Sequence, residues 1–328
     1  MKLAIIGRTE MLYETAIKLS KNHEIKLIVT APSRPEYKKH PEGFKKLAMQ
    51  IGAKYIFTKN VNDRKIIDYI KKEKLDLGVS INWVNIVKQE CMGAFKLGIL
   101  NAHCGDLPRY RGNACPNWAI LNGEDKVVMS IHYMEAGKLD SGDILGQKSI
   151  EIKKNTYIGD IYKWLRQETP KLYVETVGKL QNNPGYIYKK QKEGPQPPLR
   201  CYPRIPEDSF IEWKKNAVYI HRLVRASSEP FSGAFTYYKS EKMTIWKARL
   251  EENNHEDSEY CGVPGQIAAI NKDGTVSILT GRGKITIEQV SFKNPEKEIP
   301  SKFIKSMRDR LGLNLIKEYE RFKNKNKN

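Results

Sequence analysis

Three side chains with the chemistry to act on a carbonyl group stand in one segment, Ile99–Gln147. Asn101 and His103 end an apolar run, and residues two apart along a strand point to the same side. Asp140 follows in a loop that reads Leu-Asp-Ser-Gly-Asp, from which a carboxylate can return to the histidine. An amide and an imidazole can polarise a carbonyl, and a carboxylate can remove a proton from an attacking amine. Because no serine or cysteine belongs to this set, the residues favour direct acyl transfer over a covalent intermediate.

Each of these residues taken alone has an ordinary alternative, because single Asn, His and Asp residues in loops are commonly caps or turn formers. Cys104 lies beside His103, but alternation points its side chain the other way, so we expect it to pack rather than to attack. His132 and Met134 share one face of a later strand, and we expect both in the core. The functional prediction therefore depends on the ordered set and not on any single residue.

The sequence favours neither a metal nor a dinucleotide cofactor. The chain has five cysteines and no C-x-x-C pair, which indicates neither a disulfide framework nor a zinc site. The turn after the first strand reads Gly7-Arg8-Thr9-Glu10 and lacks G-x-G-x-x-G, so an NAD(P) enzyme is not expected. The acyl transfer described above needs no metal.

The elements that must position the three residues alternate between strands and helices over residues 1–190. This pattern predicts an α/β fold, a Rossmann-like, mostly parallel sheet with helices on both faces. Ligands of such sheets bind beyond the carboxyl ends of the strands, where Asn101 and His103 are expected. A long helix from Tyr157 to Leu180 closes this catalytic domain, and Pro170 should kink or break it. The predicted strands are residues 2–7, 24–30, 54–57, 75–80, 98–102 and 127–135.

A second, smaller domain is expected after a proline-rich linker at residues 191–204. Five short strands with glycine-containing turns predict a small OB-like β-barrel over residues 205–316. A closing helix is expected from Lys302 to Leu311. Residues 317–328 form a basic tail of low complexity, which we expect to be disordered.

The net charge of +19 would suit a nucleic-acid partner, yet the excess is spread along the chain. Much of it is lysine on expected helices, where such residues usually form a solvated face. No apolar run of about 18 residues is present, and the N-terminus carries charges where a signal peptide needs apolar residues. We therefore expect a soluble, cytoplasmic protein with no membrane partner.

The central segment closely resembles the formyltransferase family that uses 10-formyltetrahydrofolate. The signature of that family runs Asn-x-His, then Leu-Pro-x-x-Arg-Gly, then Leu-Asp-x-Gly-Asp. The resemblance extends over nearly the whole chain, although its motifs are specific only in the first domain. Asp106 departs from the pattern, because the family commonly has an apolar residue there. The three blocks are Asn101/His103, Leu107/Pro108/Arg111/Gly112 and Leu139/Asp140/Gly142/Asp143.

The resemblance implies a site for 10-formyltetrahydrofolate as the co-substrate. The loop after the fourth strand would hold its pterin, largely through backbone groups, together with Leu139. The cations near the site would bind an anionic substrate or the folate tail. The alternative for Arg111 is to brace its own loop, and the alternative for Arg8 is to be an ordinary exposed arginine. The loop residues are Ser80, Ile81, Asn82 and Trp83, and the cations are Arg8, Arg109 and Arg111.

The resemblance also implies a role for each of the three central residues. Asn101 and His103 would donate hydrogen bonds to the formyl oxygen, on which negative charge develops in the tetrahedral intermediate. Asp140 would orient His103 and, directly or through water, accept the proton of the attacking amine.

The acceptor of the formyl group is open between three classes. Our first expectation is the amine of a nucleotide-linked amino sugar, because Asn117–Glu124, Pro206–Trp213 and Gly233–Tyr238 look more like sugar-amine enzymes. The alternative is methionyl-tRNA, which the positive charge and the basic tail would suit. A third class is a formyltetrahydrofolate hydrolase-like or folate-sensing module. Whether the chain forms a homodimer is also open.

We expect His103→Ala or Asn101→Ala to leave the fold intact and folate bound. Formyl transfer should slow by about 10²–10³, the range for losing one oxyanion donor. Steady-state kinetics beside a folate-binding measurement test this, and a variant that keeps near wild-type kcat would refute the assignment.

Overall fold

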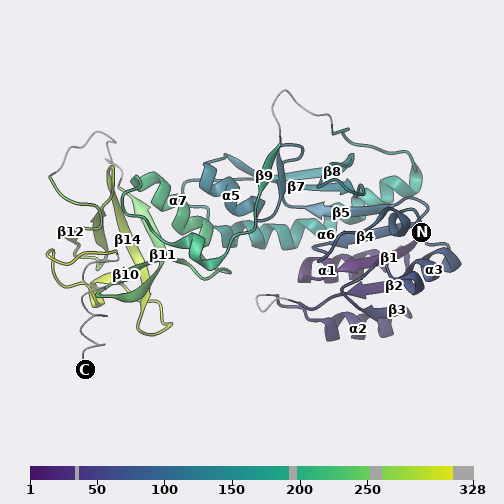
Figure 1. The fold of residues 1–328 in the computed structure, drawn as a ribbon, viewed down its shortest axis with the longest axis horizontal. Helices are drawn as coiled ribbons and strands as arrows, with labels where there is room; N and C mark the ends of the chain where they lie inside the picture. Colours follow the sequence, from purple (N-terminus) through teal and green to yellow (C-terminus); the bar gives the residue numbers. More distant parts are fainter. Residues whose placement is uncertain (34–36, 192–197, 252–260, 313–328) are drawn as a thin grey trace, which may run out of the picture. The chain divides into compact units, whose positions relative to one another are not determined.

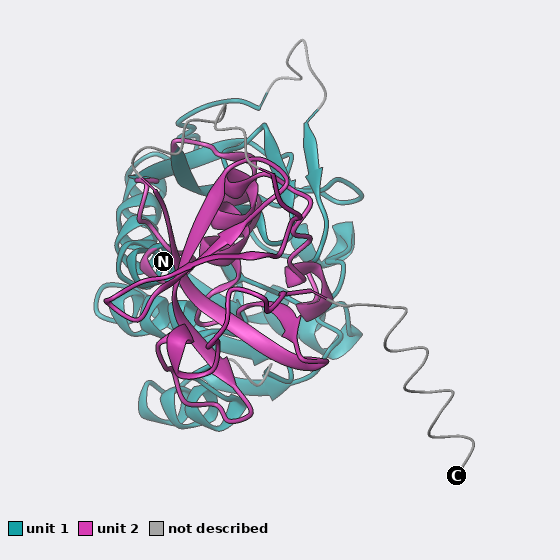
Figure 2. Cartoon of the chain, turned by 90° about the vertical axis from the view of Figure 1, so that its left-hand side faces the viewer, with its two compact units in different colours: residues 1–116, 126–151, 161–203 teal, residues 117–125, 152–160, 204–328 magenta. Residues whose placement is uncertain are grey.

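The computed structural model describes residues 1–33, 37–191, 198–251 and 261–312. The chain divides into two compact units (Figure 2). The first comprises residues 1–116, 126–151 and 161–203, and the second comprises residues 117–125, 152–160 and everything from residue 204 on. Within the described ranges, no helix is long and apolar enough to cross a membrane. The predicted tail, residues 317–328, lies outside the described residues.

The first unit is built on a seven-stranded sheet in the order β3-β2-β1-β4-β5-β7-β8 (Figure 1). The pairs β2–β3, β1–β2, β1–β4 and β4–β5 are parallel, whereas β5–β7 and β7–β8 are antiparallel. The predicted mostly parallel sheet is confirmed. The strands are β1 (Lys2–Gly7), β2 (Glu24–Thr30), β3 (Lys54–Phe57), β4 (Leu77–Ile81), β5 (Ile99–His103), β7 (Lys126–Tyr133) and β8 (Ile144–Glu151).

Helices cover both faces of this sheet, as the strand and helix alternation predicts. One face packs against α3 and α4 around Ile67, Ile70 and Cys91. Leu12 and Leu19 of α1 are fully buried, and Tyr13 of α1 contacts Phe44 of α2. Loops follow the carboxyl ends of β4 and β5 before the next helix or strand begins. The helices of this unit are α1 (Glu10–Leu19), α2 (Pro41–Gln50), α3 (Arg64–Glu73), α4 (Gln89–Met92) and, from residue 161 on, α6 (Ile158–Asn182), whereas most of α5 (Cys115–Asn122) belongs to the second unit.

The long helix α6 is not broken at Pro170, since it is continuous from Ile158 to Asn182, and the predicted kink stays a prediction. A proline inside a helix removes one backbone hydrogen bond. Buried side chains on both sides of it, such as Leu165 and Tyr173, hold the helix against the sheet. The Tyr173 hydroxyl donates a 2.6 Å hydrogen bond to the carbonyl of Ser80 at the end of β4. Tertiary packing therefore outweighs the local penalty.

The second unit contains the predicted small β structure. Its antiparallel sheet has the order β10-β11-β14-β13-β12. Bridges from Leu311 to Tyr238 and from Arg310 to Gln266 join its two edges, which closes the sheet. Helix α7 (Ala217–Ser227) begins where the Asn216 side chain accepts a hydrogen bond from Tyr219 N. The strands are β10 (Ala234–Tyr238), β11 (Glu241–Leu250), β12 (Ile267–Ile270), β13 (Val276–Leu279) and β14 (Lys284–Phe292).

The predicted closing helix from Lys302 to Leu311 is wrong. Only a short 3₁₀ turn, η2 (Pro300–Lys302), is helical there, and the following residues extend toward the bridges of Arg310 and Leu311. Helical periodicity was outweighed by the backbone hydrogen bonds that the two exposed sheet edges offer. A second 3₁₀ turn, η1 (Pro206–Ser209), precedes α7.

The proline-rich segment between the units is tied into the first unit. Residues Leu199–Cys201 form β9, which pairs in parallel with β6 (Tyr110–Gly112). Arg109 O accepts a 2.7 Å hydrogen bond from Leu199 N, and Cys201 O accepts one of 2.9 Å from Asn113 N. The loop that follows Asn101 and His103 is therefore held by Leu199–Cys201, residues that the sequence assigns to the linker.

Candidate active site

Strand β5 delivers Asn101 and His103 to the carboxyl edge of the sheet. Asn101 lies opposite Ser80 of β4 and opposite His132 of β7, while His103 lies opposite Ser130. The ring of His103 is buried, with 6% of its surface exposed, and Asn101 is partly exposed. The amide is therefore the more accessible of the two groups.

Asp140 reaches this edge from the loop between β7 and β8. Its Oδ2 lies 3.5 Å from Nδ1 of His103 and accepts a 2.9 Å hydrogen bond from Gly112 N. The backbone of Asp140 has a φ of 46°, a left-handed conformation that aspartate tolerates better than most residues. The structure thus brings Asn101, His103 and Asp140 together, as the motif spacing predicts.

His132 also belongs to this cluster, and we had predicted only a core position for it. Its side chain is buried, yet Nε2 lies 3.5 Å from Oδ1 of Asp140 and 3.4 Å from Nδ2 of Asn101. The sequence indicates this position only in part: His132 lies on the strand before the Asp140 loop, and alternation places it on the same face as Ser130. Its contacts depend on the antiparallel register of β5 and β7, which the sequence does not state.

Each histidine is anchored to a backbone carbonyl through its other ring nitrogen. Nε2 of His103 lies 2.8 Å from Tyr110 O, and Nδ1 of His132 lies 2.7 Å from Tyr133 O. A carbonyl can only accept, so both of these nitrogens carry a proton. In neutral rings the nitrogens that face Asp140 are then unprotonated. The carboxylate stands between two proton acceptors, and the gap on either side is longer than a hydrogen bond.

Burial and neighbouring charges act on the pKa values of the cluster in opposite directions. Burial lowers the pKa of His103, and the charge of Asp140 only partly opposes the effect of burial. Burial would raise the pKa of Asp140, but the two histidines and the Gly112 N–H outweigh burial and hold it at about 2. At neutral pH the cluster therefore contains a carboxylate and a neutral His103.

Close packing of the loop after β5 keeps the ring of His103 in place. A Cβ on Gly105 would lie 2.3 Å from Nε2 of His103 and 2.5 Å from Tyr110 O, so only glycine fits there. Ser130 Oγ donates a 3.0 Å hydrogen bond to Gly105 O, and Gln147 Nε2 donates one of 2.9 Å to Ser130 Oγ. The loop is thus fixed from both sides of the sheet edge.

The residues predicted to hold the pterin lie around the end of β4. Ser80 and Ile81 are buried, Asn82 and Leu139 are exposed, and Trp83 is half-buried. Asn82 has a φ of 53°, which turns the chain sharply after the strand. The indole N–H of Trp83 and the hydroxyl of Ser80 are buried with no hydrogen-bond partner. Ser80 is the strand partner of Asn101, whereas Trp83 packs against the core cluster around α3 and α4.

The three predicted substrate cations have partners within the protein. Arg8 donates to Pro32 O at 2.7 Å and to Asn82 O at 3.4 Å, which braces the loop after β4. The Arg109 guanidinium lies over the ring of Tyr110. Arg111 donates a 3.0 Å hydrogen bond to Gln191 Oε1. Substrate contacts of these three residues stay a prediction.

Gln191 connects Arg111 with the Asp140 loop, a role that the sequence did not indicate. Its Nε2 donates to Asp140 O at 3.0 Å and to Gly142 O at 2.7 Å. Gly142 itself is confined, because a Cβ there would lie 2.1 Å from Tyr133 O. One side chain thereby joins the second and third motif blocks.

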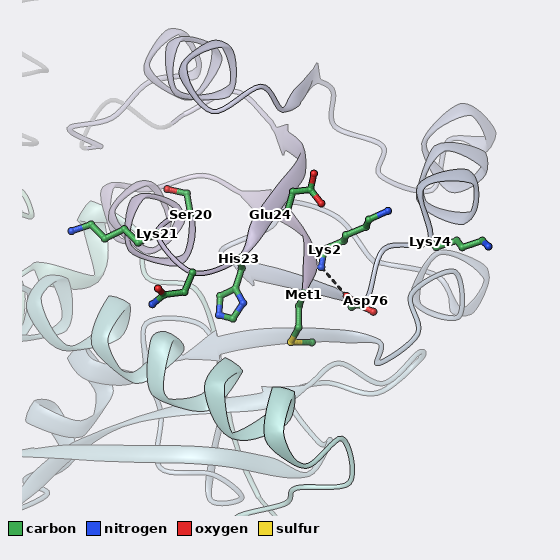
Figure 3. Close-up of a pocket in the computed structure, with 9 residues that line it drawn as sticks. Met1, Lys2, Ser20, Lys21, His23, Glu24, Lys74 and Asp76 are labelled. Atoms are coloured by element: carbon green, nitrogen blue, oxygen red, sulfur yellow. Dashed lines mark hydrogen bonds between the residues drawn. The ribbon is translucent and has the colours of Figure 1, made fainter.

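A separate, open hollow lies at the other end of the strands. Figure 3 shows Met1, Lys2, His23, Glu24 and Asp76 around it, at the amino ends of β1 and β2. Lys2 N donates a 2.7 Å hydrogen bond to Asp76 Oδ2. This hollow is remote from Asn101 along the strand direction and contributes nothing to the cluster. Among the described residues, no group of three or more His, Cys, Asp and Glu side chains is arranged to hold a metal ion.

The lowered pKa of His103 makes a prediction about stability. Because His103 titrates below the usual 6.5 in the folded chain, the unfolded chain binds more protons as pH falls below 6.5. The free energy of unfolding should therefore decrease as pH is lowered from 6.5. Asp140 adds a further loss only at pH values near and below its usual 3.8.

Urea unfolding at several pH values between about 5 and about 7.5, a range that spans the usual histidine pKa, measures this effect. His103→Asn should show a shallower decrease than the wild type. The exposed His40 gives the control, since His40→Asn should keep the wild-type slope. An unchanged slope in His103→Asn would show that His103 is not held neutral.

Comparisons with known proteins identify the family of this chain. Residues 1–177 match the family model described as formyl transferase, and residues 204–308 match formyl transferase, C-terminal domain. A methionyl-tRNA formyltransferase from Acetivibrio thermocellus is 29% identical over 312 residues, which cover 93% of this chain and 96% of that protein. Another, from Clostridium botulinum, is 30% identical over 301 residues, which cover 90% of this chain and 93% of that protein.

Among solved structures, the fold is similar to an N-formyltransferase from Helicobacter canadensis in complex with folinic acid and dTDP-3-aminofucose. The TM-score is 0.63 at 21% identity, and the match covers 88% of this chain and 98% of that chain. The two family models together span most of the sequence, including all three motif blocks and the closed β sheet of the second unit. The chain therefore belongs to the formyltransferase family, whose members take their formyl group from 10-formyltetrahydrofolate.

Proposed function

We propose that this formyltransferase moves the formyl group of 10-formyltetrahydrofolate to the amine of methionyl-tRNA, with Asn101, His103 and Asp140 as its catalytic residues. The observation that carries the chemical part is the contact of one carboxylate with two histidines beside an accessible amide. The acceptor is argued separately below, because the cluster serves any amine.

The Asn101 amide is the hydrogen-bond donor best placed for the formyl oxygen. Its Nδ2 has a long 3.4 Å contact to His132 Nε2, and the side chain is partly exposed. In contrast, Nε2 of His103 is already engaged by Tyr110 O. Asn101 therefore stabilises the developing oxyanion, and His103 acts mainly on the proton.

The proton of the attacking amine needs a base, and we assign this role to Asp140 and His103 together. A carboxylate with a pKa of about 2 is a weak base by itself. A proton taken up on Nδ1 of His103 would face Oδ2 of Asp140, which lies 3.5 Å away. The positive charge of the resulting imidazolium is balanced by Asp140, so the amine loses its proton as it attacks.

The pterin of the co-substrate would be held by the loop that follows β4. The hydroxyl of Ser80, which has no hydrogen-bond partner and lies on the strand partner of Asn101, supports this placement, since a pterin offers carbonyl and ring-nitrogen acceptors. Leu139, which is 41% exposed beside Asp140, would cover an apolar part of the ligand. The formyl carbon would then lie near Asn101.

Methionyl-tRNA as the acceptor revises our first expectation of an amino sugar. The two methionyl-tRNA formyltransferases named above match this chain over both of its domains and over nearly their own full lengths. The net charge of +19 also suits a polyanion better than a nucleotide with two phosphates. Short sequence segments that look like sugar-amine enzymes are weaker support than a match over the whole chain.

A nucleotide-linked amino sugar is the second candidate. The fold similarity to the Helicobacter canadensis enzyme, which was solved with dTDP-3-aminofucose, favours it. At 21% identity this similarity concerns the fold and leaves the acceptor open.

The acceptor can be tested with the purified chain, 10-formyltetrahydrofolate, methionyl-tRNA and a panel of nucleotide-linked amino sugars. We expect formylation of methionyl-tRNA, and an affinity that falls steeply with salt, by about 0.7–0.9 log units per log unit of salt for each phosphate contact. A reaction without the protein serves as the control for uncatalysed transfer, and Asn101→Ala as the control for the loss of one donor. Efficient formylation of a sugar with a shallow salt dependence, and none of methionyl-tRNA, would overturn the tRNA assignment but leave formyl transfer intact.

A further inference from the structure

The backbone of Asp140 is in a strained conformation that other segments must hold. Its φ of 46° lies in the left-handed region, which residues other than glycine adopt only at a cost in free energy. Within the loop itself, the Ser141 hydroxyl donates a 3.0 Å hydrogen bond to Glu135 Oε2, but this contact lies at the exposed surface. The loop therefore depends on contacts from elsewhere in the chain to keep Asp140 in place.

Gln191, the first residue of the predicted linker, supplies such contacts. Its Nε2 donates to Asp140 O at 3.0 Å and to Gly142 O at 2.7 Å, so one amide group binds the carbonyls on both sides of Ser141. Gly142 cannot move toward the sheet, because even a Cβ there would lie 2.1 Å from Tyr133 O. The loop is thus held between the Gln191 side chain and strand β7.

The position of Gln191 is fixed in turn by two motif residues. Its Oε1 accepts a 3.0 Å hydrogen bond from Arg111 Nη2, and its backbone N–H donates to Asp143 Oδ1 at 3.3 Å. Lys189, two residues earlier, forms an antiparallel bridge with Ile144. A guanidinium can only donate and a carbonyl can only accept, so Arg111 determines which end of the Gln191 amide faces the loop.

These contacts close a ring around the catalytic carboxylate. Asp140 Oδ2 accepts a 2.9 Å hydrogen bond from Gly112 N, and Gly112 directly follows Arg111. The contacts run from Arg111 to Gln191, from Gln191 to the carbonyl of Asp140, and from its carboxylate back to the residue beside Arg111. The carboxylate within this ring lies 3.5 Å from the facing nitrogen of each histidine.

We propose that Gln191 is a positioning residue for the carboxylate of Asp140, and that Arg111 and Asp143 act through Gln191. Without the two donors of Gln191, the Asp140 backbone relaxes and its carboxylate moves away from the histidines. The expected loss is in turnover and not in folate binding. The effect on turnover rests on the proposed function, because a displaced Asp140 slows transfer only if it takes part in proton removal. The position of the loop does not rest on it.

Gln191→Met tests this role, because methionine keeps the length of the side chain and has no donor. With the acceptor that the wild type formylates, kcat should fall by about 10²-fold, the effect of a small misplacement of a catalytic group. The KM for 10-formyltetrahydrofolate should stay near the wild-type value. Gln191→Glu keeps an acceptor for Arg111 but has no donor, so it should lose kcat as well. Gln50→Met, at an exposed glutamine that ends α2, is the control and should keep the wild-type kcat.

Amide hydrogen exchange at Gly112 reports the position of Asp140 without any turnover. In Gln191→Met the Gly112 N–H should exchange about 5–30-fold faster, the range for losing one or two hydrogen bonds of ordinary strength. The N–H of Val79, in the interior strand β4, should keep its protection, which shows that the fold is intact.

Four outcomes would overturn the proposal. They are a wild-type kcat in Gln191→Met, a wild-type kcat in Gln191→Glu, a lowered kcat with unchanged exchange at Gly112, and an equal loss of protection at Gly112 and Val79. The last of these would show general destabilisation in place of positioning. A wild type that transfers no formyl group refutes the proposed function alone, and exchange at Gly112 still decides whether Gln191 holds the loop.

Discussion

The site depends on one buried carboxylate that stands between two imidazoles. Asp140 lies 3.5 Å from a ring nitrogen of His103 and 3.5 Å from one of His132, and its one short contact is with Gly112 N. Both rings are turned by backbone carbonyls so that their proton-accepting nitrogens face the carboxylate. Such an arrangement has room for one more proton. In the reaction proposed above, the substrate amine would supply that proton.

The rest of the first unit supports this arrangement. Parallel strands bring Asn101 and His103 to the sheet edge beside the loop after β4, and antiparallel β7 adds His132. Glycines at positions 105 and 142 leave room where any side chain would collide with His103 or Tyr133. Gln191 ties the Arg111 loop to the Asp140 loop. Rigid support of this kind is what holds catalytic groups within productive distance of one another.

Much of the fold and the three motif residues could be predicted because they follow local patterns. Strand alternation places Asn101 and His103 on one side, and the apolar strands alternate with helices. His132 could not be assigned to the site, since its contacts come from the register between β5 and β7. The sequence does not show that these two strands pair. A break at Pro170 and a helix at Lys302–Leu311 are absent for a related reason, because packing and sheet-edge hydrogen bonds outweighed local propensity.

The central claim concerns protons, and nitrogen-15 NMR of the histidine rings tests it most directly. In the free protein at neutral pH, the account predicts that His103 carries its proton on Nε2 and that His132 carries its proton on Nδ1. His103→Asn and His132→Asn provide the assignments of the two rings. A neutral His103 with its proton on Nδ1 would contradict the account, because Asp140 would then already hold a donor and could not share an incoming proton with that ring.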